Sequence, residues 1–467
     1  MTVDKLSPNE LGHVYLYCTL RTDSEFQQLD LGIGNNTLQK AMKTCSGRDL
    51  KTIKASITEI GDYGKVIESY KAGQSKLSNI FAKTVKKNRL TFDYVFRLMR
   101  SIAGLSGTGA NTTKEKWIGE LLIDATALES RFITRFFLTN WRMGSAEKFF
   151  QNSLARAFLI KAITAKNEGK DKKFVSTENT EELNRWEKGL QRVLSQYPYH
   201  VKVIESLQKV DDIDDVLPDC HLSVGIPCKP MLAKPTKDIA IIFKRFENMP
   251  FTCEFKYDGL RGQIHYKNGD VNIFSRNLEN MTQQYPDIIE NLNNCIDKKN
   301  IESLIIDAEI VGFDLKSGRI LPFQTLMTRN KKNVTSNNIE IQVCIFVFDM
   351  IFLNGESLLQ KSLQARRDTL FASINEIEGK VKYVKYQNTH EVDEIQELLN
   401  ESVKIGCEGL MLKTLETNST YEPCMRSFKW LKMKRDYLES SLGDSLDLVP
   451  IGAKFGEGKR TGFYGGF

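Results

Sequence analysis

The residue whose surroundings most suggest chemistry is Lys256, within the run Glu-Phe-Lys-Tyr-Asp-Gly-Leu-Arg of residues 254–261. The apolar residues before it predict a strand, and the Asp-Gly pair after it predicts a turn. The lysine amine then lies at a strand end, beside a carboxylate and an arginine. A lysine in such a place can act as a nucleophile towards a phosphate-bearing substrate. The alternative is a surface lysine in an Asp-Gly hairpin, and this stretch alone does not decide between the two.

Later predicted strands carry polar residues where a buried strand would normally have apolar ones. Asp307 and Glu309 are two residues apart, so on a regular strand they share one face. Glu408 directly precedes an apolar strand, and Lys432 and Lys434 share a face of another. Each of these features alone fits a turn residue or an exposed sheet face, and their occurrence together makes that explanation weaker.

These residues, together with the ring of Phe348, make up a set that fits a nucleoside triphosphate with Mg²⁺. Lysines and an arginine suit the phosphates, carboxylates suit the metal, and an aromatic ring suits the base. The sequence therefore predicts a nucleotide-binding site built from several strands.

The order of these segments resembles the motifs of covalent nucleotidyltransferases, and more closely those of ATP-dependent DNA ligases of the eukaryotic DNA ligase I type. The motifs are Glu254-Phe-Lys256-Tyr-Asp258-Gly259-x-Arg261, Ser275-Arg276-Asn277, Asp307-Ala-Glu309, Phe348-Asp349, Glu408-Gly409-x-Met411-x-Lys413 and Trp430-Leu-Lys432-Met-Lys434. Linking text such as Pro230-Met231-Leu232-Ala233 is similar to the same branch, and the resemblance extends over essentially the whole chain.

The resemblance implies that Lys256 attacks the α-phosphate of ATP and forms a phosphoramidate with AMP, a step for which the amine must be unprotonated. Glu254 would accept a hydrogen bond from the adenine amino group, and Phe348 would stack on adenine. The nucleotide would also contact Arg261, Arg276, Glu309, Glu408, Arg426, Lys432 and Lys434, and Mg²⁺ would be held by Asp258, Glu309 and Glu408. AMP would then pass to the 5′-phosphate of a nick, which the 3′-hydroxyl attacks.

The N-terminal part of the sequence reads as helical over residues 1–162, beginning with a capping box at Ser7. A small-residue loop over 103–113 ends where a helix is predicted to begin, so its amides could bind a phosphate, although a flexible interhelical loop is the alternative. One-sided basic charge over 131–161 indicates a surface that faces DNA. The predicted DNA contacts are Gly107, Thr108, Gly109, Arg131, Arg135 and Arg142.

The predicted fold class is multidomain. An all-α DNA-binding domain over 1–221 precedes an α+β nucleotidyltransferase domain with antiparallel sheets over 222–436, and the start of an OB-fold barrel over 437–467. Residues 164–188 are highly charged and are predicted to be a long surface connection. Residues 381–386 are predicted to form one short strand.

Composition excludes several other classes of protein. The net charge is +6, from 65 basic and 59 acidic residues, which permits DNA binding without requiring it. The nine cysteines form no C-x-x-C pair, so a disulfide framework or a zinc site is not expected. No leader-like or membrane-length apolar stretch occurs. The expected partners are ATP and nicked double-stranded DNA, bound by a monomer without a membrane, in the nucleus or alternatively the mitochondrion; the sequence does not identify replication or repair factors.

The family resemblance also implies a complete C-terminal OB-fold that assists self-adenylation, and the chain after Lys434 is too short to close such a barrel. The expectation is a truncated chain that forms the AMP adduct slowly and seals poorly. A non-catalytic nick-binding fragment is one alternative. An mRNA guanylyltransferase shares the Lys-x-Asp-Gly core, but it has no need of a large basic helical domain, and the same objection applies to an RNA ligase.

Overall fold

The computed structural model describes residues 3, 5–27, 31–81, 90–144, 147–166, 180–236, 239–246, 249–330, 334–335, 338–389, 391–434, 449–456 and 460–466. These form two compact units. The first comprises Met1–Leu190, His200–Ile213 and Leu446–Phe467, and the second comprises Gln191–Tyr199 and Asp214–Ser445. The hydrogen bond from the Lys229 amide to the Ser195 carbonyl lies within the second unit. The three predicted domain ranges stay a prediction.

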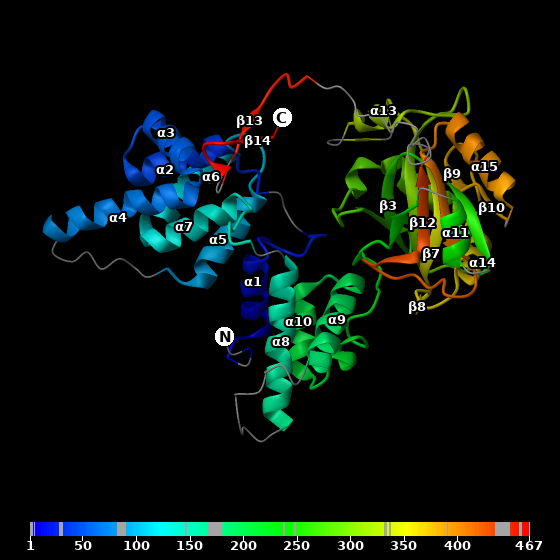
Figure 1. The fold of residues 1–467 in the computed structure, drawn as a ribbon, viewed down its shortest axis with the longest axis horizontal. Helices are drawn as coiled ribbons and strands as arrows, with labels where there is room; N and C mark the ends of the chain where they lie inside the picture. The colour runs from blue at the N-terminus through cyan, green and yellow to red at the C-terminus, as the bar shows by residue number, and fades with distance from the viewer. Residues whose placement is uncertain are drawn as a thin grey trace. The chain divides into compact units, whose positions relative to one another are not determined.

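The first unit is built from helices, as the sequence predicts (Figure 1). The capping box of Ser7 and Glu10 starts the first helix. The helices are α1 (Pro8–Cys18), α2 (Asn35–Ser46), α3 (Leu50–Ile60), α4 (Tyr63–Phe81), α5 (Phe92–Gly104), α6 (Ala110–Asp124), α7 (Ala127–Phe137), α8 (Glu147–Lys166), α9 (Thr180–Gln196) and α10 (His200–Lys209). Helices α2, α3, α4, α5, α6 and α7 share one apolar core, which includes Phe136 and Trp141.

The predicted surface connection over 164–188 is wrong at both ends. Helix α8 continues to Lys166, and α9 already begins at Thr180. The charged composition of this stretch belongs in part to the exposed side of α9, whose other side buries Trp186 and Leu190. Amphipathic helices combine the two kinds of residue, so composition alone understated the helix. Residues 167–179 lie outside the described part of the chain.

The second unit contains a five-stranded sheet in the order β1-β12-β11-β2-β10 and a seven-stranded sheet along the path β4-β3-β5-β7-β8, with β6 on β5 and β9 on β7. The strands are β1 (Leu232–Pro235), β2 (Phe251–Lys256), β3 (Leu260–Lys267), β4 (Asp270–Ser275), β5 (Ser303–Asp314), β6 (Arg319–Ile320), β7 (Val343–Leu353), β8 (Glu356–Ser357), β9 (Val381–Tyr383), β10 (Tyr386–Asn388), β11 (Gly409–Thr414) and β12 (Arg426–Lys434). The helices are α11 (Ile239–Phe246), α12 (Pro286–Cys295), α13 (Phe323–Met327), α14 (Leu363–Ser373) and α15 (Val392–Lys404).

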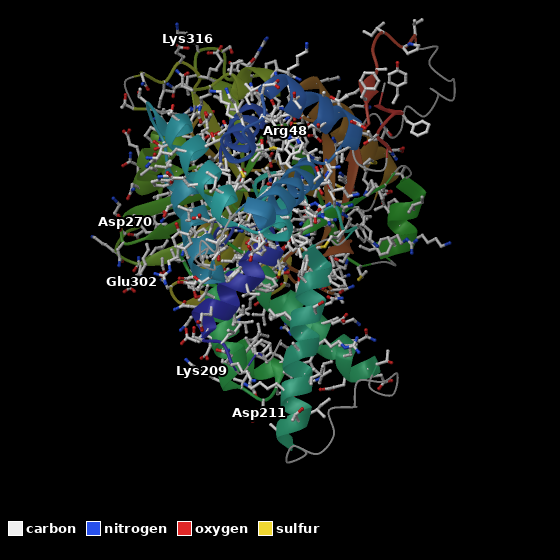
Figure 2. All side chains as sticks on the ribbon, turned by 90° about the vertical axis from the view of Figure 1, so that its left-hand side faces the viewer. Arg48, Lys209, Asp211, Asp270, Glu302 and Lys316 are labelled. Atoms are coloured by element: carbon white, nitrogen blue, oxygen red, sulfur yellow. The ribbon has the colours of Figure 1, made fainter. Side chains whose placement is uncertain are left out.

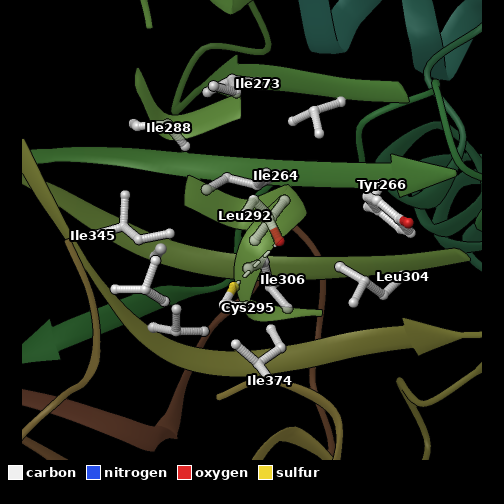
Figure 3. Packing of buried hydrophobic residues seen from close by; sticks show 14 of the residues in the cluster. Ile264, Tyr266, Ile273, Ile288, Leu292, Cys295, Leu304, Ile306, Ile345 and Ile374 are labelled. Carbon is white, nitrogen blue, oxygen red and sulfur yellow. Dashed lines mark hydrogen bonds between the residues drawn. The ribbon is translucent and has the colours of Figure 1, made fainter. Parts of the chain in front are cut away.

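Each sheet has one apolar face covered by helices. Figure 3 shows Ile288 and Leu292 of α12 packed against Ile264, Ile306 and Ile345 of the seven-stranded sheet. Residues of α11 and α15 pack in the same way on the five-stranded sheet. Charged residues at strand and turn ends, such as Asp270, Glu302 and Lys316, lie instead at the surface (Figure 2). The opposite faces carry the polar residues named above, and on β5 these stand beside buried apolar residues such as Ile305 and Val311.

The predicted single strand over 381–386 is in fact two strands in two sheets. β9 pairs in parallel with β7, whereas β10 pairs antiparallel with β2. Between them, the Val384 amide donates to Val347 and the Lys385 carbonyl accepts from Phe255. This segment therefore fastens the two sheets together, which local sequence could not indicate.

The C-terminal part shows one antiparallel pair, β13 (Lys454–Phe455) with β14 (Tyr464–Gly466). Such a pair does not identify an OB-fold, so that part of the predicted fold class is still a prediction. Residues 435–448, which fall mostly in the predicted third domain, lie outside the described residues. The helical first unit and the mainly antiparallel sheets of the second agree with the rest of the prediction. None of the described helices has both the length and the apolar character that crossing a membrane requires.

Gly409 is required by the close approach of neighbouring backbone. Its φ is +145°, and a Cβ atom there would lie 2.2 Å from the Met433 carbonyl oxygen. We expect Gly409→Ala to lower the free energy of unfolding by at least about 3 kcal/mol, because backbone strain and a steric clash add. Gly406 has a positive φ with open space around it, so Gly406→Ala is the matched control and should cost only about 1 kcal/mol. Equal losses in denaturant unfolding would contradict the role of the clash.

Candidate active site

Strand register places Lys256 and Lys434 on either side of Gly409, in one row across three neighbouring strands. Residues opposite each other in an antiparallel pair point to the same side. Glu408, just before β11, lies between the two amines: its Oε2 is 2.8 Å from Lys256 Nζ and 2.6 Å from Lys434 Nζ. The sequence predicted a site role for all three, and the structure brings them together.

The rows that follow on the same face combine charged residues with Met411 and Trp430. Glu254 lies opposite Met411, which lies opposite Lys432, and beyond that row Lys413 lies opposite Trp430. The intervening residues, such as Phe255 and Leu410, point the other way into the apolar core. The alternation predicted for β12 is thus confirmed, and β2 and β11 follow it.

Glu254 is deeply buried at 2 % exposure and is held by two cations. Arg367 of α14 donates to its Oε1 at 2.7 Å, and Lys413 Nζ lies 2.5 Å from its Oε2. Arg367 was missed by the sequence reasoning. Its partner is far away along the chain, and an arginine in a helix normally reads as a solvated residue.

The seven-stranded sheet contributes Asp307 and Glu309, which do share one face. Arg261 of β3 lies opposite Glu309 of β5 and donates a hydrogen bond of 2.7 Å to Asp307 Oδ2. On β7, Phe348 joins the same face because the pairing jumps from Asp349 to Val347, which leaves Phe348 as the extra residue of a β-bulge. Without that bulge, only one of the neighbouring residues Phe348 and Asp349 could lie on this face.

The two polar faces meet, because side chains from one sheet contact those from the other. The Lys413 amine lies 4.6 Å from the Phe348 ring centroid and 4.4 Å from that of Trp430. The Phe348 and Trp430 rings themselves meet edge to face, with centroids 6.3 Å apart. The site is therefore a meeting of two sheets, with an aromatic pair at its centre.

A closed ring of hydrogen bonds ties the segment before β1 to this site. The Met231 amide donates to the Tyr421 hydroxyl, which donates to Asp307 Oδ2 at 2.6 Å. Arg261 donates to Asp307, to Tyr421 and to the Met231 carbonyl, which closes the ring. Tyr421 was not predicted as a site residue, because its contribution depends on partners from three distant segments.

Charge and burial shift several pKa values at the site. Burial raises the pKa of Glu309 to about 7, against the opposing effect of the Lys256 and Arg261 charges. Burial, and then the charge of Glu408, raises the pKa of Asp258 above its ordinary value. For Glu408 burial acts upward, yet its contacts with Lys256 and Lys434 bring its pKa below the ordinary value.

The same forces act on the cations. Burial, followed by the charges of Lys434, Lys256 and Arg426, lowers the pKa of Lys432. Arg426 therefore lies near enough to influence the site, at the exposed start of β12. Arg276 lies exposed just after β4, and no contact with the other predicted site residues is found among the described side chains.

A further question is whether the carboxylates of the site could hold a metal ion without other ligands. Within the described ranges, no group of three or more His, Cys, Asp and Glu side chains is placed to hold a metal ion. Glu309 nevertheless has no hydrogen bond or ion pair with any described residue, which leaves its carboxylate available. Mg²⁺ is commonly held by one or two carboxylates together with substrate phosphates, so these residues fit a shared site rather than a preformed cage.

The predicted phosphate-binding loop of the first unit is exposed and precedes α6, as expected. Gly107 and Gly109 have φ values of +87° and +84°, and Gly109 is the N-cap residue of α6 without a side-chain cap. The amides at this helix start are therefore not capped by their own N-cap side chain, a geometry that suits an anion.

The predicted basic surface needs one correction. Arg135 is 3 % exposed and donates to Asp62 and to the Trp141 carbonyl, so it stabilises the helical core and does not reach the surface. Arg131 is partly exposed and pairs with Glu68 at 3.3 Å, and Arg142 is half-buried with φ +53°. A charge count along the sequence could not see that a carboxylate from α4's start faces Arg135.

Comparison with known protein families agrees with this geometry. The description "ATP dependent DNA ligase domain" matches residues 230–434, and "DNA ligase N terminus" matches residues 2–155. A protein named DNA ligase from Caldivirga maquilingensis is 32% identical over 97% of this chain and 70% of its own length. The chain belongs to the family of ATP-dependent DNA ligases.

Within that family the chain is similar to proteins named DNA ligase 1. Those of Dictyostelium discoideum and Arabidopsis thaliana are each 39% identical to it, over 99% and 100% of this chain. The chain spans 38% of the first relative and 57% of the second, so it covers about half of their length.

Glu309→Gln tests how much stability the folded protein loses when the buried Glu309 carboxylate is ionised. The folded protein keeps a proton on Glu309 up to about pH 7, whereas the unfolded chain loses it near 4.5, so stability falls as pH rises between these values. The substitution should raise the melting temperature at about pH 8 by about 2–4 °C and by less at about pH 5.5. Thermal melting at both values checks this. Exposed Glu290 supplies the control variant, and an equal shift at both pH values would contradict the expectation.

Tyr421→Phe tests the hydrogen-bonded ring. The change removes only the hydroxyl and leaves the buried Met231 amide without its acceptor, so unfolding should become easier by about 1–3 kcal/mol. Tyr266 is equally buried, and no hydrogen bond of its hydroxyl is found among the described residues, which makes Tyr266→Phe the matched control with a smaller loss. Denaturant unfolding of both variants measures the difference; a similar loss in both would sink the idea.

Proposed function

We propose that this chain carries the nucleotide-transfer site of a DNA ligase that uses ATP to seal nicks in duplex DNA through a lysyl-AMP intermediate and a DNA-adenylate. The observation that carries the proposal is the row of Lys256, Gly409 and Lys434 with Glu408 between the two amines. A nucleophile flanked by a second lysine and a carboxylate is what transfer of a phosphate-bearing group requires.

In this proposal Lys256 Nζ attacks the α-phosphorus of ATP. A nitrogen–phosphorus bond forms, and the bond between the α-phosphorus and the oxygen that bridges to the β-phosphorus breaks. Pyrophosphate leaves with that electron pair, and the amine proton passes to solvent. Lys256 must first part from Glu408, with which it is paired in the structure. Lys432 and Lys434 would stabilise the charge that develops on the α-phosphate.

The remaining predicted residues take roles that their surroundings support. Glu254 would accept from the adenine amino group and Phe348 would stack on the base. Arg261 Nε and Asp307 Oδ1 are buried and have no hydrogen-bond partner among the described residues. Arg261 Nε can therefore donate to a ribose or phosphate oxygen, and Asp307 Oδ1 can accept from a ribose hydroxyl. Arg276 and Arg426, both exposed at strand ends, would contact phosphates when ligand is bound.

Mg²⁺ would be held by Glu309, Glu408 and Asp258 together with the phosphates of ATP. When bound, the ion supplies Lewis-acid stabilisation of phosphate charge. The raised pKa of Glu309 means that this carboxylate is partly protonated near neutral pH, so its availability to a cation increases through about pH 7.

The helical unit would hold the duplex by its backbone, with little reading of sequence. Gly107, Thr108 and Gly109 would bind a phosphate at the start of α6, and Arg131 and Arg142 remain proposed contacts; Arg135 does not. We extend the proposal to a monomer on nicked DNA, acting in replication and repair in the nucleus, with the mitochondrion as the alternative. The proposed domains are 1–221, 222–436 and 437–467.

Incubation with α-labelled ATP and Mg²⁺ tests the nucleophile. We expect a labelled protein band that acid releases, and its loss in Lys256→Ala and Lys256→Arg. Lys267→Ala, at an exposed strand end, is the matched control and should keep the label. Labelling by GTP in place of ATP would favour guanylyl transfer, and retention of nicked DNA without any label would favour the non-catalytic alternative. Label that survives in Lys256→Ala would refute the proposal.

A further inference from the structure

Two consecutive arginines of α14 are buried and each reaches a carboxylate on a strand. Arg366 is fully buried and holds Asp349 by two parallel hydrogen bonds of 2.7 and 2.8 Å. Arg367 is 3 % exposed and donates to Glu254 at 2.7 Å. The two residues are alike in burial and partner type, and they differ in what the partner does.

Asp349 has both oxygens engaged by Arg366. Glu254 is held differently, because Arg367 engages Oε1 and Lys413 engages Oε2. Each carboxylate oxygen has two acceptor positions, so one contact on each oxygen leaves acceptor capacity on Asp349 and Glu254 alike. The two carboxylates are distinguished by their position. Glu254 points to the same side of β2 as Lys256, two residues further on.

The protonation state of Glu254 decides which base it can read. An ionised carboxylate only accepts hydrogen bonds, so it suits the 6-amino group of adenine and opposes the 6-oxo group of guanine or hypoxanthine. A protonated carboxyl can donate, and it would accept the 6-oxo group as well. Glu254 is deeply buried, and the two cations beside it offset the cost of burying its charge and fix the direction of its acceptor positions.

Arg367 is the more reliable of the two cations. Burial lowers the pKa of Lys413, whereas a guanidinium does not lose its proton in a protein. Arg367 is also fixed in place, since its guanidinium lies 4.1 Å from the Tyr386 ring centroid on β10 and its Nη1 is 3.4 Å from Thr252 Oγ1. The charge beside Glu254 is thus both permanent and oriented.

We infer that Arg367 is a positioning residue that sets nucleotide specificity, by holding the Glu254 carboxylate turned towards the base as a hydrogen-bond acceptor so that 6-amino purines are selected over 6-oxo purines. This inference rests on the proposed role of Glu254. Arg367 itself touches no part of the nucleotide, and Arg366 takes no part in the selection.

The test compares ATP with ITP, which differ in the group at position 6. The ratio of the two kcat/KM values for formation of the labelled adduct is measured for the wild type, Arg367→Gln, Arg367→Lys and Arg366→Gln. We expect the ratio of the ATP value to the ITP value to fall by at least about tenfold in Arg367→Gln, because Glu254 is no longer held as an acceptor. It should change by less than about threefold in Arg367→Lys, which keeps the charge, and in Arg366→Gln.

Circular dichroism and thermal melting establish that each variant folds, and Arg367→Met, an unbranched neutral side chain, takes the place of Arg367→Gln if that variant does not. Equilibrium binding of ATP and ITP, the latter as the competing probe, replaces adduct formation if turnover is too slow. A neutral Arg367 variant that folds and keeps the wild-type ratio overturns the inference. So does an equal fall in Arg366→Gln.

Glu254→Gln separates this inference from the function on which it rests. An amide both donates and accepts, so the variant should lose the preference for ATP with Arg367 intact. If Glu254→Gln keeps the wild-type ratio, the proposed role of Glu254 fails, and the inference about Arg367 fails with it. If Glu254→Gln loses the preference while the neutral Arg367 variant keeps it, only the inference about Arg367 fails.

Discussion

The register of three antiparallel strands is the constraint from which the site follows. β11 pairs with β2 on one side and with β12 on the other, so Lys256, Gly409 and Lys434 fall in one row. A shift of one residue in either pairing would turn the polar residues of that strand into the core. Gly409 permits this row, because its backbone passes too near Met433 for a side chain. Chemistry at one amine thus depends on the alignment of residues far apart in the sequence.

Buried carboxylates at the site are each matched to an arginine from another element. Glu254 has Arg367, Asp307 has Arg261, and Asp349 has Arg366. A buried charge without a partner is strongly unfavourable, so these pairs must form together with the sheets. Glu309 of β5 has no ion pair among the described residues, and burial raises its pKa. The arginine–carboxylate pairs and the Glu309 carboxylate, which has no such partner in the described part of the chain, therefore occur in the same site.

Much of the local structure could be predicted from sequence. Patterns a few residues long predict three features: the strand that ends at Lys256, the shared face of Asp307 and Glu309, and the helices of the first unit. The conjunction of Lys256, Glu408 and Lys434 was also recoverable, because family motifs carry it. Arg367 and Tyr421 were not, since their partners lie 113 and 114 residues away and no local pattern records such a distance. Arg135 failed for the same reason, because Asp62 lies 73 residues from it.

The bulge in β7 has a consequence for anyone who wishes to transplant this site. A second extra residue at Ile351 accompanies Phe348, so the strand departs twice from regular alternation. An ideal strand of identical composition would place either the Phe348 ring or the Asp349 carboxylate on this face, but never both. A designed scaffold that copied the residues with a regular strand backbone would therefore lose either the Phe348 ring from this face or the Asp349 anchor of α14. The scaffold must therefore reproduce the two bulges of β7 themselves, together with the added strand twist that bulges cause.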